Sequence, residues 1–524
     1  MLSALQKAKR AGAKVISINP LPETGMQNFK NPQELRGWIG KPTPIADLFL
    51  QVRINADIAL LKAIMLVLLE MEEAAPGSAI DKDFIEKNTV GYEAVLTDLQ
   101  QYSLPHLSET CGVSISDIRK AAQLIQAGKK MIICWAMGIT QHVNGVENIK
   151  EIVNLLLLRG SIGKPGAGAC PVRGHSNVQG DRTVGIWEHL KPAFKEKLEQ
   201  QFDFVAPSKT GYNTVEAIQA MHAKKAKVFF SMGGNLLLAA PDTEYTAQAM
   251  RNCDLTVMVS TKPNRNHLVT GKTALILPCR GRTEQDQQIA GLQFVSVENS
   301  MGIVHKSQGG LPPASEHLIS EPDIVARLAQ ATLGKDTKVE WEAMVQNYDL
   351  IRDAIEACIP GFDNYNERVR REGGFYLPNG PREGKFTTAD QKAHFNVTSV
   401  PMHPLKEGQY LMTTIRSHDQ FNTTIYDNND RYRGIHNGRR IIMMHPSDIK
   451  EAGLQQGDYV DLTSHFNGEE RIAPNFMVVP FDIPTKCVAT YFPEANVLVP
   501  VGQYAKSYTP ASKSVVISMR KVIS

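Results

Sequence analysis

Short apolar runs that end at a glycine or a polar residue alternate with helical patterns through the middle of the chain. These runs occupy residues 130–138, 226–235, 254–261 and 274–278. Strands that alternate with helices predict an α/β fold with a doubly wound parallel sheet, whose ligands bind beyond the carboxyl ends of the strands. Gln141, Asn235 and Ser260 fall at such ends. Each could equally be a turn or helix-capping residue.

The first hundred residues continue this α/β pattern. Residues 1–10 follow an amphipathic helix pattern and residues 14–20 are an apolar strand, which together predict the second half of a βαβ unit. We therefore expect that an N-terminal portion with the preceding strand is missing from these 524 residues, or that the strand is supplied from elsewhere. Helical apolar spacing covers residues 46–72, and Ser114 is predicted to cap another helix.

The last part of the chain has a β pattern instead. Short β runs separated by turn signals lie at residues 410–414, 459–463, 476–479 and 514–517. They predict a small C-terminal β-barrel. One helix is expected within it, starting at a Ser447 cap and stopping at Gly453.

Charge and cysteine usage exclude several functions. The 57 basic and 54 acidic residues leave a net charge of +3, too small for an electrostatic nucleic-acid partner. The apolar run at residues 58–71 is too short to span a bilayer. The seven cysteines are scattered singly, which favours a reduced, intracellular protein and argues against an iron–sulfur cluster within this chain.

A glycine-rich run at residues 163–180 gathers the densest set of ligand-binding groups. Glycines allow a ligand to approach the main chain, Arg173 can hold an anion through two parallel bonds, and Asn177 and Gln179 offer paired donors and acceptors. His175 adds an imidazole. The pattern predicts a large polar ligand, although a solvated glycine-rich loop is the alternative.

Several motifs together resemble the formate-dehydrogenase-like molybdopterin oxidoreductases of the alpha-subunit type. The motifs are AKVISINPL, CWAMGITQH, NLLLLRGSIGKPGAGACPVRGHSNVQGDRTVG, SMGGN and RSHDQFNTTIYDNNDRYRG. The resemblance implies a molybdenum or tungsten ion between two pterin guanine dinucleotides. It also implies that a 4Fe–4S cluster and the cysteine or selenocysteine ligand of the metal belong to the missing N-terminal region, so no metal ligand is assigned in this chain.

The resemblance also divides the chain into domains. Residues 1–104 would end a first α/β dinucleotide-binding domain, and residues 105–374 would form a second, molybdopterin-binding α/β domain with a returning segment. Residues 375–408 would be a linker. Residues 409–524 would be a β-barrel domain, similar to a double-psi barrel, that binds the dinucleotide.

Site residues are assigned from the matching positions. Arg173 would face the metal and stabilise an anion, and His175, where close formate enzymes have glutamine, would relay a proton or hydrogen-bond the pterin. This departure puts formate as the substrate in doubt. The other positions are implied to contact the cofactor: Met137, Gln141, Gly174, Asn177, Gln179, Gly180, Asn235, Asp242, Ser260, Thr261, Arg416, Ser417, His418, Gln420, Asn422, Thr423, Thr424, Phe492, Asn496 and Lys513.

The sequence thus predicts a large part of a cytoplasmic molybdenum or tungsten oxidoreductase that exchanges two electrons between a small substrate and an electron carrier. These 524 residues alone are expected to be inactive, and the Arg173 and Arg416 segments are expected to line one cleft. The alternative is a non-catalytic subunit that binds cofactor or a partner. A nicotinamide dehydrogenase is less favoured because no G-x-G-x-x-G follows a strand.

Overall fold

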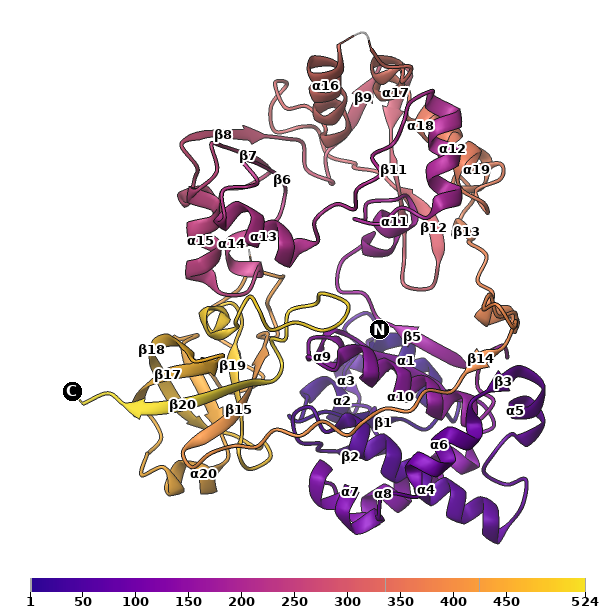
Figure 1. The fold of residues 1–524 in the computed structure, drawn as a ribbon, viewed down its shortest axis with the longest axis vertical. Helices are drawn as coiled ribbons and strands as arrows, with labels where there is room; N and C mark the ends of the chain where they lie inside the picture. The colour runs from indigo at the N-terminus through magenta and orange to yellow at the C-terminus, as the bar shows by residue number, and fades with distance from the viewer. Residues whose placement is uncertain (1, 335, 424, 524) are drawn as a thin grey trace. The chain divides into compact units, whose positions relative to one another are not determined.

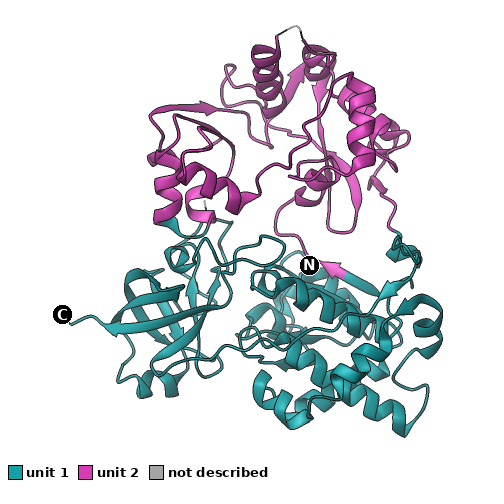
Figure 2. Cartoon of the chain, in the orientation of Figure 1, with its two compact units in different colours: residues 1–169, 241–243, 380–524 teal, residues 170–240, 244–379 magenta. Residues whose placement is uncertain are grey.

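The computed structural model describes residues 2–334, 336–423 and 425–523, which form two compact units (Figure 2). Unit 1 holds residues 1–169, 241–243 and 380–524, and unit 2 holds residues 170–240 and 244–379. The units do not follow the predicted boundaries. A boundary at residue 104 would cut a single hydrophobic core, because helices on both sides of it pack together in unit 1.

The first part of unit 1 is mainly helical (Figure 1). Its elements are α1 (Leu2–Arg10), β1 (Ile16–Ile18), α2 (Thr24–Gln27), α3 (Leu35–Ile39), β2 (Leu48–Leu50), α4 (Asp57–Ala74), α5 (Lys82–Asn88), β3 (Thr89–Val90), α6 (Tyr92–Leu99), α7 (Leu104–Cys111), α8 (Ile115–Ala127), β4 (Ile132–Trp135), α9 (Met137–Thr140) and α10 (Gly145–Leu158). The predicted cap is confirmed, since the Asp117 amide donates to Ser114 Oγ at 3.1 Å.

Helix α4 is the centre of this part. It is apolar around most of its circumference, as expected of a helix enclosed by others, and it packs against α7, α8 and α10. The predicted helix over residues 46–72 begins too early, because β2 precedes it and pairs in parallel with β1, Ile16 opposite Leu48. Strand β1 therefore has a neighbour that the sequence did not reveal.

The last part of unit 1 is a closed six-stranded barrel, which confirms the β prediction. Its strands run in the order β15, β19, β16, β18, β17, β20, and they are β15 (Gln409–Ile415), β16 (Ile441–Met444), β17 (Tyr459–Phe466), β18 (Glu469–Pro480), β19 (Cys487–Tyr491) and β20 (Val515–Lys521). Pairs β15–β19 and β16–β18 are parallel. Closure leaves no exposed sheet edge.

Both faces of the central barrel strands are buried. Ile442 and Met444 belong to a core with residues from the other strands, whereas Ile441 and Met443 pack in a second core with Leu21 and Ile54 of the first part. The strands β16 and β19 therefore lack the alternation of polar and apolar residues by which a half-exposed strand is recognised.

The barrel helix α20 (Pro446–Glu451) begins two residues earlier than predicted from a Ser447 cap. Its cap is His445, whose Nδ1 accepts from the Ser447 amide at 3.2 Å, and Ser447 itself lies inside the first turn. Proline at the first helical position explains the shift, because its missing N–H needs no partner there. Two short elements of unit 1 precede the barrel in the chain: a single 3₁₀ turn at Pro381–Glu383, and β14 (Ala393–His394), which pairs with β3.

Unit 2 contains a parallel sheet and a hairpin region. Its elements are β5 (Gly168–Pro171, entering from unit 1), α11 (Val178–Thr183), α12 (Pro192–Phe202), α13 (Thr214–His222), β6 (Val228–Met232), α14 (Leu236–Ala239), α15 (Thr243–Arg251), β7 (Leu255–Ser260), β8 (Thr273–Pro278), β9 (Asp286–Gln288), β10 (Gly291–Gln293), β11 (Val295–Glu298), β12 (Ile303–Ser307), α16 (Glu321–Leu333), α17 (Trp341–Gln346), α18 (Tyr348–Cys358), α19 (Tyr365–Arg368) and β13 (Phe375–Tyr376).

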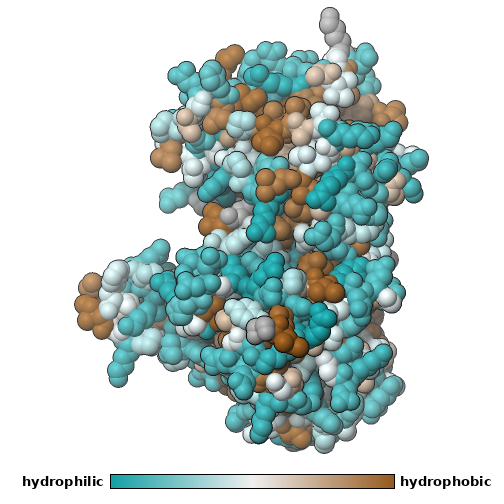
Figure 3. All heavy atoms as spheres, turned by 90° about the vertical axis from the view of Figure 1, so that its left-hand side faces the viewer, coloured by the Kyte–Doolittle hydropathy of each residue, from teal (hydrophilic) through white to brown (hydrophobic). Residues whose placement is uncertain are grey.

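The parallel sheet runs β6, β7, β8 in register, Val228 opposite Leu255 and Leu255 opposite Thr273. The mixed α/β prediction is confirmed, with three parallel strands in this sheet. Apolar side chains reach the surface among hydrophilic ones (Figure 3). In unit 2, Leu275 and Ile276 of β8 are exposed. None of the helices in the described part of the chain has the length and apolar character required to cross a membrane.

Candidate cofactor-binding site

The Arg173 loop, residues 172–177, joins β5 to α11 in unit 2. Its backbone is held by a neighbouring hairpin, since the Arg173 amide donates to Ser300 Oγ at 3.0 Å. Arg173 Nε donates to Gln179 Oε1 at 3.3 Å, so the sequence-predicted pair is brought together. Arg173, Gly174 and His175 are exposed, which leaves the guanidinium and imidazole accessible to a ligand.

Asn177 lies in the left-handed region with φ 65° and is used within the fold. Its Oδ1 accepts from the Glu298 amide at 3.0 Å, and its Nδ2 donates to Asp181 at 2.9 Å. The side-chain amide predicted to contact a ligand is thus engaged by the protein. Gly180 is buried directly behind it, because a Cβ there would lie 2.0 Å from Asn177 Oδ1.

The earlier glycines of the same run have a packing role. Gly163 has φ 77°, and a Cβ on it would lie 2.7 Å from the Gly384 backbone. Lys164 Nζ lies 2.7 Å from Asp81 Oδ2. The backbone of Gly163 therefore packs against another segment of unit 1 and is not open to a ligand. Within this run, only the Arg173 loop can still bind the predicted ligand.

The carboxyl ends of β6 and β7 form a second polar edge in unit 2. Gly233 and Gly234 both have positive φ, and a Cβ on either would meet nothing within 4 Å, so this backbone is open. Asn235 is buried before α14, while Ser260 Oγ donates to the Lys262 carbonyl at 2.8 Å in a local turn. Thr261 is exposed beside it. Open glycine turns at strand ends suit a pyrophosphate.

In unit 1, the end of α9 meets the last loop of the barrel. Gln141 Oε1 accepts from Ser512 Oγ and its carbonyl accepts from the Lys513 amide, both at 3.0 Å. Met137, one turn earlier, is 44% exposed and remains available to a ligand. Gln141 thus joins two segments more than 370 positions apart.

Four basic side chains form a cluster at this junction, which we call the basic cluster: His142, His403, Arg416 and Lys513. Lys513 is buried and its Nζ donates to the Thr414 carbonyl. Burial lowers the pKa of Lys513 to about 7, and the charge of Arg416 adds to this effect. Burial also lowers the pKa of His142 to about 3, with further repulsion from Lys513 and His403.

No carboxylate of the described residues pairs with Lys513, so its charge is uncompensated within that part of the chain. An anionic ligand would supply the missing charge. The guanidinium of Arg416 stacks over the Phe492 ring, 4.6 Å from its centroid, and burial lowers the Arg416 pKa. Three sequence-predicted residues, Arg416, Phe492 and Lys513, are therefore brought together.

Arg439 organises the rest of the Arg416 loop, and the sequence did not point to it. It is buried and donates to Ser417 Oγ at 2.8 Å, to Gln420 Oε1 at 2.9 Å and to both oxygens of Glu494. Gln420 Nε2 donates to the Phe492 carbonyl at 2.7 Å. Ser417 and Gln420 thus act within the fold. An arginine pair, Arg439 and Arg440, directly before the apolar run of β16 was the available signal.

His418 belongs to a partly buried ion network. Its ring nitrogens lie 2.9 Å from Asp430 Oδ1 and 3.2 Å from Glu23 Oε2, and Arg433 contacts the same two carboxylates. The hydrogen bonds to Asp430 and Glu23 raise the pKa of His418 to about 9. His418, which was predicted to contact the cofactor, thus links the N-terminal end of α2 to the loop that follows β15 in the barrel.

Asp242 and Asn496 meet in unit 1, although they were predicted in different domains. The Asp242 amide donates to the Asn496 carbonyl at 3.2 Å, and Asp242 Oδ2 accepts from Arg471 Nε at 2.5 Å. Asn422 has φ 49° and Thr423 is buried. Thr424, also predicted at the site, lies outside the described residues.

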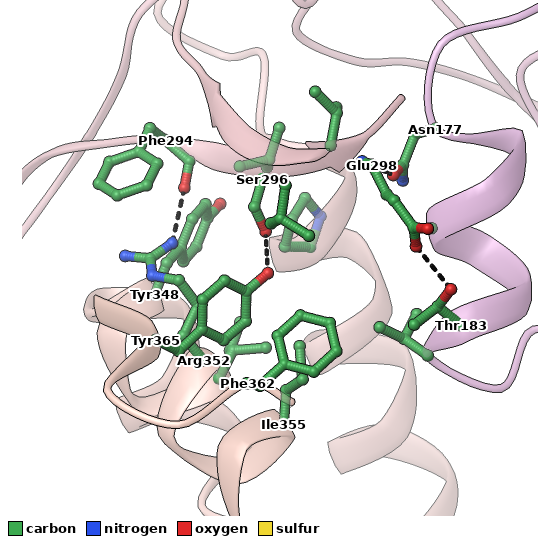
Figure 4. Close-up of a pocket in the computed structure, with 17 residues that line it drawn as sticks. Asn177, Thr183, Phe294, Ser296, Glu298, Tyr348, Arg352, Ile355, Phe362 and Tyr365 are labelled. Atoms are coloured by element: carbon green, nitrogen blue, oxygen red, sulfur yellow. Dashed lines mark hydrogen bonds between the residues drawn. The ribbon is translucent and has the colours of Figure 1, made fainter. Parts of the chain in front are cut away.

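A pocket of about 190 Å³ lies beside α11 in unit 2 (Figure 4). Its wall is mainly aromatic and aliphatic, with Phe294, Phe362 and Tyr365 among the lining residues. Thr183 Oγ1 donates to Glu298 Oε2 at 2.5 Å on one side of it. The pocket thus shares residues with the support of the Arg173 loop.

No group of three or more His, Cys, Asp or Glu side chains positioned to hold a metal ion occurs in residues 2–334, 336–423 and 425–523. The Arg173 loop belongs to unit 2 and the Arg416 loop to unit 1. Each loop is therefore a site element of its own unit, and their predicted common cleft stays a prediction.

Comparison with family models identifies both parts of the chain. The model described as molybdopterin oxidoreductase matches residues 3–286, and the model described as molydopterin dinucleotide binding domain matches residues 410–515. The first match includes the Arg173 loop, and the second includes the Arg416 loop and the barrel strands before β20.

Three related proteins are similar to the chain in sequence over most of its length. The chain is 46% identical to the uncharacterized oxidoreductase Rv2900c of Mycobacterium tuberculosis, over 99% of this chain and 68% of the relative. It is 40% identical to protein YdeP of Escherichia coli, over 99% and 70%. Identity falls to 24% with the F420-dependent formate dehydrogenase subunit alpha of Methanocaldococcus jannaschii, over 88% and 65%.

A solved structure supports the fold. The acetylene hydratase from Pelobacter acetylenicus matches 99% of this chain and 75% of its own, with a TM-score of 0.66 and 16% sequence identity. At this identity the match concerns the fold alone.

Proposed function

Because this chain belongs to the molybdopterin oxidoreductase family, we propose that it binds molybdopterin guanine dinucleotide and that its holoprotein oxidises or reduces a small substrate by two electrons. The cofactor, when bound, supplies a molybdenum or tungsten centre for the electron exchange. We further propose a formate-dehydrogenase-like reaction, two dinucleotides, a 4Fe–4S cluster in the holoprotein, an electron-carrier partner and a cytoplasmic location.

The observation that carries the proposal is the buried, uncompensated charge of Lys513. Without a ligand, burial lowers its pKa to about 7, which is costly for an ammonium that has only carbonyl and hydroxyl partners at Thr414. A phosphate next to Lys513 and Arg416 would offset this cost through charge-assisted hydrogen bonds. The residues therefore fit a dinucleotide in unit 1.

Unit 2 offers two more groups to the same kind of ligand. The open backbone at Gly233 and Gly234 suits a second pyrophosphate, since glycine N–H groups can approach phosphate oxygens without a Cβ in the way. Arg173 donates through Nε to Gln179, and among the described residues its two terminal nitrogens have no hydrogen-bond partner. They would bind an anionic substrate and hold it in place.

His175 is the group proposed to move a proton. An imidazole can take up or release a proton at a ring nitrogen, which an amide at the same position cannot do. We propose that it takes or returns the substrate proton when two electrons are exchanged. His175 therefore favours a substrate whose reaction includes a proton transfer. A substrate that only has to be held by a hydrogen bond could be served by an amide at this position.

Metal and pterin analysis tests the proposal. The chain, purified without oxygen, should contain molybdenum or tungsten and release a fluorescent oxidised pterin and guanosine monophosphate. Lys513→Met should lower the pterin content several-fold, because it removes the buried ammonium. Lys506→Met is the matched control, since Lys506 is exposed and pairs with Glu147.

Two outcomes would count against the proposal. A folded wild-type protein without pterin and metal would favour the alternative of a non-catalytic, partner-binding subunit. Equal pterin contents in the Lys513→Met and wild-type proteins would remove Lys513 from the site. The expectation that these 524 residues alone are inactive stays a prediction, which a turnover assay with viologen dyes tests.

A further inference from the structure

Three hydrogen bonds fasten the segment 173–183 to the hairpin formed by β11 and β12. The Arg173 amide donates to Ser300 Oγ at 3.0 Å, at the tip of the hairpin. The Glu298 amide donates to Asn177 Oδ1 at 3.0 Å, and Thr183 Oγ1 donates to Glu298 Oε2 at 2.5 Å (Figure 4). The beginning, middle and end of the segment are thus all held by two residues, Glu298 and Ser300.

Close packing reinforces these bonds. Asn177 has φ 65°, a conformation that asparagine tolerates better than most residues, and the turn allows its Oδ1 to reach the hairpin. A Cβ on Gly180 would lie 2.0 Å from that Oδ1 and 3.3 Å from Glu298 Cβ. There is no room between α11 and the hairpin for even a methyl group.

A fourth contact comes from the segment that follows β8. Arg282 Nη1 donates to Ser176 Oγ at 2.7 Å and its Nη2 to Ser307 Oγ, near the end of β12, at 3.4 Å. Arg282 therefore joins the loop to the same hairpin from a different direction. The residue next to Ser176 in the chain is His175, which is exposed.

The backbone of the loop is thus held in place, while the side chains of Arg173 and His175 are exposed to solvent. The anchors are the amide of Arg173 and the side chains of Ser176, Asn177 and Thr183, whereas Arg173 and His175 remain exposed. Holding a loop in this way before a ligand arrives removes the cost of ordering it during binding. Preorganised donors also stabilise developing charge without having to reorganise.

We propose that Glu298 and Ser300 are positioning residues that hold the Arg173 loop in its ligand-ready conformation. The inference rests on the proposed function, because it assigns Arg173 and His175 to the substrate. Glu298 acts as a hydrogen-bond acceptor for Thr183, and neither Glu298 nor Ser300 needs to touch the substrate. We call the contacts of Glu298 and Ser300 with segment 173–183 the clamp. The clamp fixes the backbone from which the side chains of Arg173 and His175 project.

Hydrogen exchange of peptides covering residues 173–183 in the full chain tests the clamp. Glu298→Ala removes the acceptor of Thr183, so amides of the segment should exchange about tenfold faster or more. Glu298→Gln keeps an acceptor oxygen and should restore most of the protection. The midpoint of global unfolding should stay close to that of the wild type, because the hairpin and sheet cores are untouched. Only the exchange rates of the local amides should rise.

Matched variants separate the hydrogen bond from other effects. Thr183→Val should accelerate exchange as Glu298→Ala does, and Thr183→Ser should not. Thr183 Oγ1 also lies within hydrogen-bond distance, 3.2 Å, of the carbonyl of Gln179 in its own helix. Thr332→Val is therefore the control, since the Thr332 hydroxyl donates only within its own helix, to the Leu328 carbonyl. Ser300→Ala against Ser300→Thr tests the Arg173 anchor independently if a Glu298 variant fails to fold.

Exchange within twofold of wild type in both Glu298→Ala and Ser300→Ala would overturn the clamp. Equally fast exchange in Glu298→Gln and Glu298→Ala would overturn the acceptor role of Glu298. These readouts need no cofactor. A protein without pterin but with the expected exchange pattern would therefore refute the proposed function and leave the clamp intact. A protein that contains pterin but whose variants exchange like the wild type would refute the clamp and leave the proposed function intact.

Discussion

Arg439 and Glu494 form a two-pronged ion pair at the barrel, with Nε 2.7 Å from Oε1 and Nη2 3.2 Å from Oε2. The same guanidinium also holds Ser417 and Gln420 of the Arg416 loop. A planar fork with five N–H donors can satisfy all of these acceptors at once, which an ammonium cannot. Arg439 therefore determines how the Arg416 loop is presented.

Replacing Arg439 should be costly for stability. Arg439→Met leaves Glu494 without its cation, and breaking a buried pair in this way costs about 3–5 kcal/mol. Chemical denaturation measures the loss. Arg440→Met is the control, because Arg440 is exposed and makes one hydrogen bond, to the Pro474 carbonyl; it should cost about 0.5 kcal/mol or less. Equal losses in both variants would contradict the hub role of Arg439.

Lys513 should make the stability of the ligand-free protein depend on pH. Its pKa of about 7 lies below the ordinary 10.5, so between these values the unfolded chain binds more protons than the folded one. The free energy of unfolding should therefore rise by a few kcal/mol as the pH rises from 7 towards 10.5. Urea titrations at several pH values should show that Lys513→Met lacks this rise and that Lys506→Met retains it.

His418 should have the opposite effect. Its pKa is raised to about 9 by Asp430 and Glu23, so the folded protein binds more protons than the unfolded chain between pH 6.5 and 9. The stabilisation is complete below pH 6.5 and is lost as the pH rises through 9. His418→Gln should lower the free energy of unfolding at pH 6 by roughly 1–2 kcal/mol, allowing for solvent screening, and much less at pH 9.5.

The control for this prediction is His394→Gln, which removes an exposed histidine that pairs with Asp390. Its effect at pH 6 should be within about 0.5 kcal/mol. A His418→Gln effect that stays the same from pH 6 to pH 9.5 would show that packing, and not the protonated ring, accounts for the loss.

Gly180 and Gly174 should respond differently to alanine. A Cβ on Gly180 would lie 2.0 Å from Asn177 Oδ1, whereas one on Gly174 would meet nothing within 4 Å. Gly180→Ala should therefore displace Asn177, break its bond with the Glu298 amide and cost about 1–3 kcal/mol. Thermal unfolding of the cofactor-free variants measures the difference. A stable Gly180→Ala protein would show that the loop can move away at little cost.

Much of the fold could be predicted from local patterns. The strands β6, β7 and β8 are confirmed because each is a short apolar run between turn residues, and α8 because Ser114 caps it. Strands β16 and β19 were missed for a physical reason. Both of their faces are buried, so no alternation of polar residues marks them.

The candidate site was predicted less completely. Arg416, Phe492 and Lys513 were assigned by resemblance and do come together, and so do Arg173 and Gln179. His418 was assigned to the same loop, but it forms an ion network with Glu23, almost 400 positions earlier. A polar residue in a loop has the same local pattern whether it serves a ligand or the fold.

The amino-acid sequence by itself determined the α/β and barrel segments, the polar loops and the family, because dihedral preferences, apolar periodicity and motifs extend over a few neighbouring residues. Tertiary structure alone decided which polar groups face one another: Gln141 with Ser512, Asp242 with Asn496, Glu298 with Thr183. These pairings arise from packing between segments more than a hundred residues apart, and packing depends on shape and burial that no local pattern encodes.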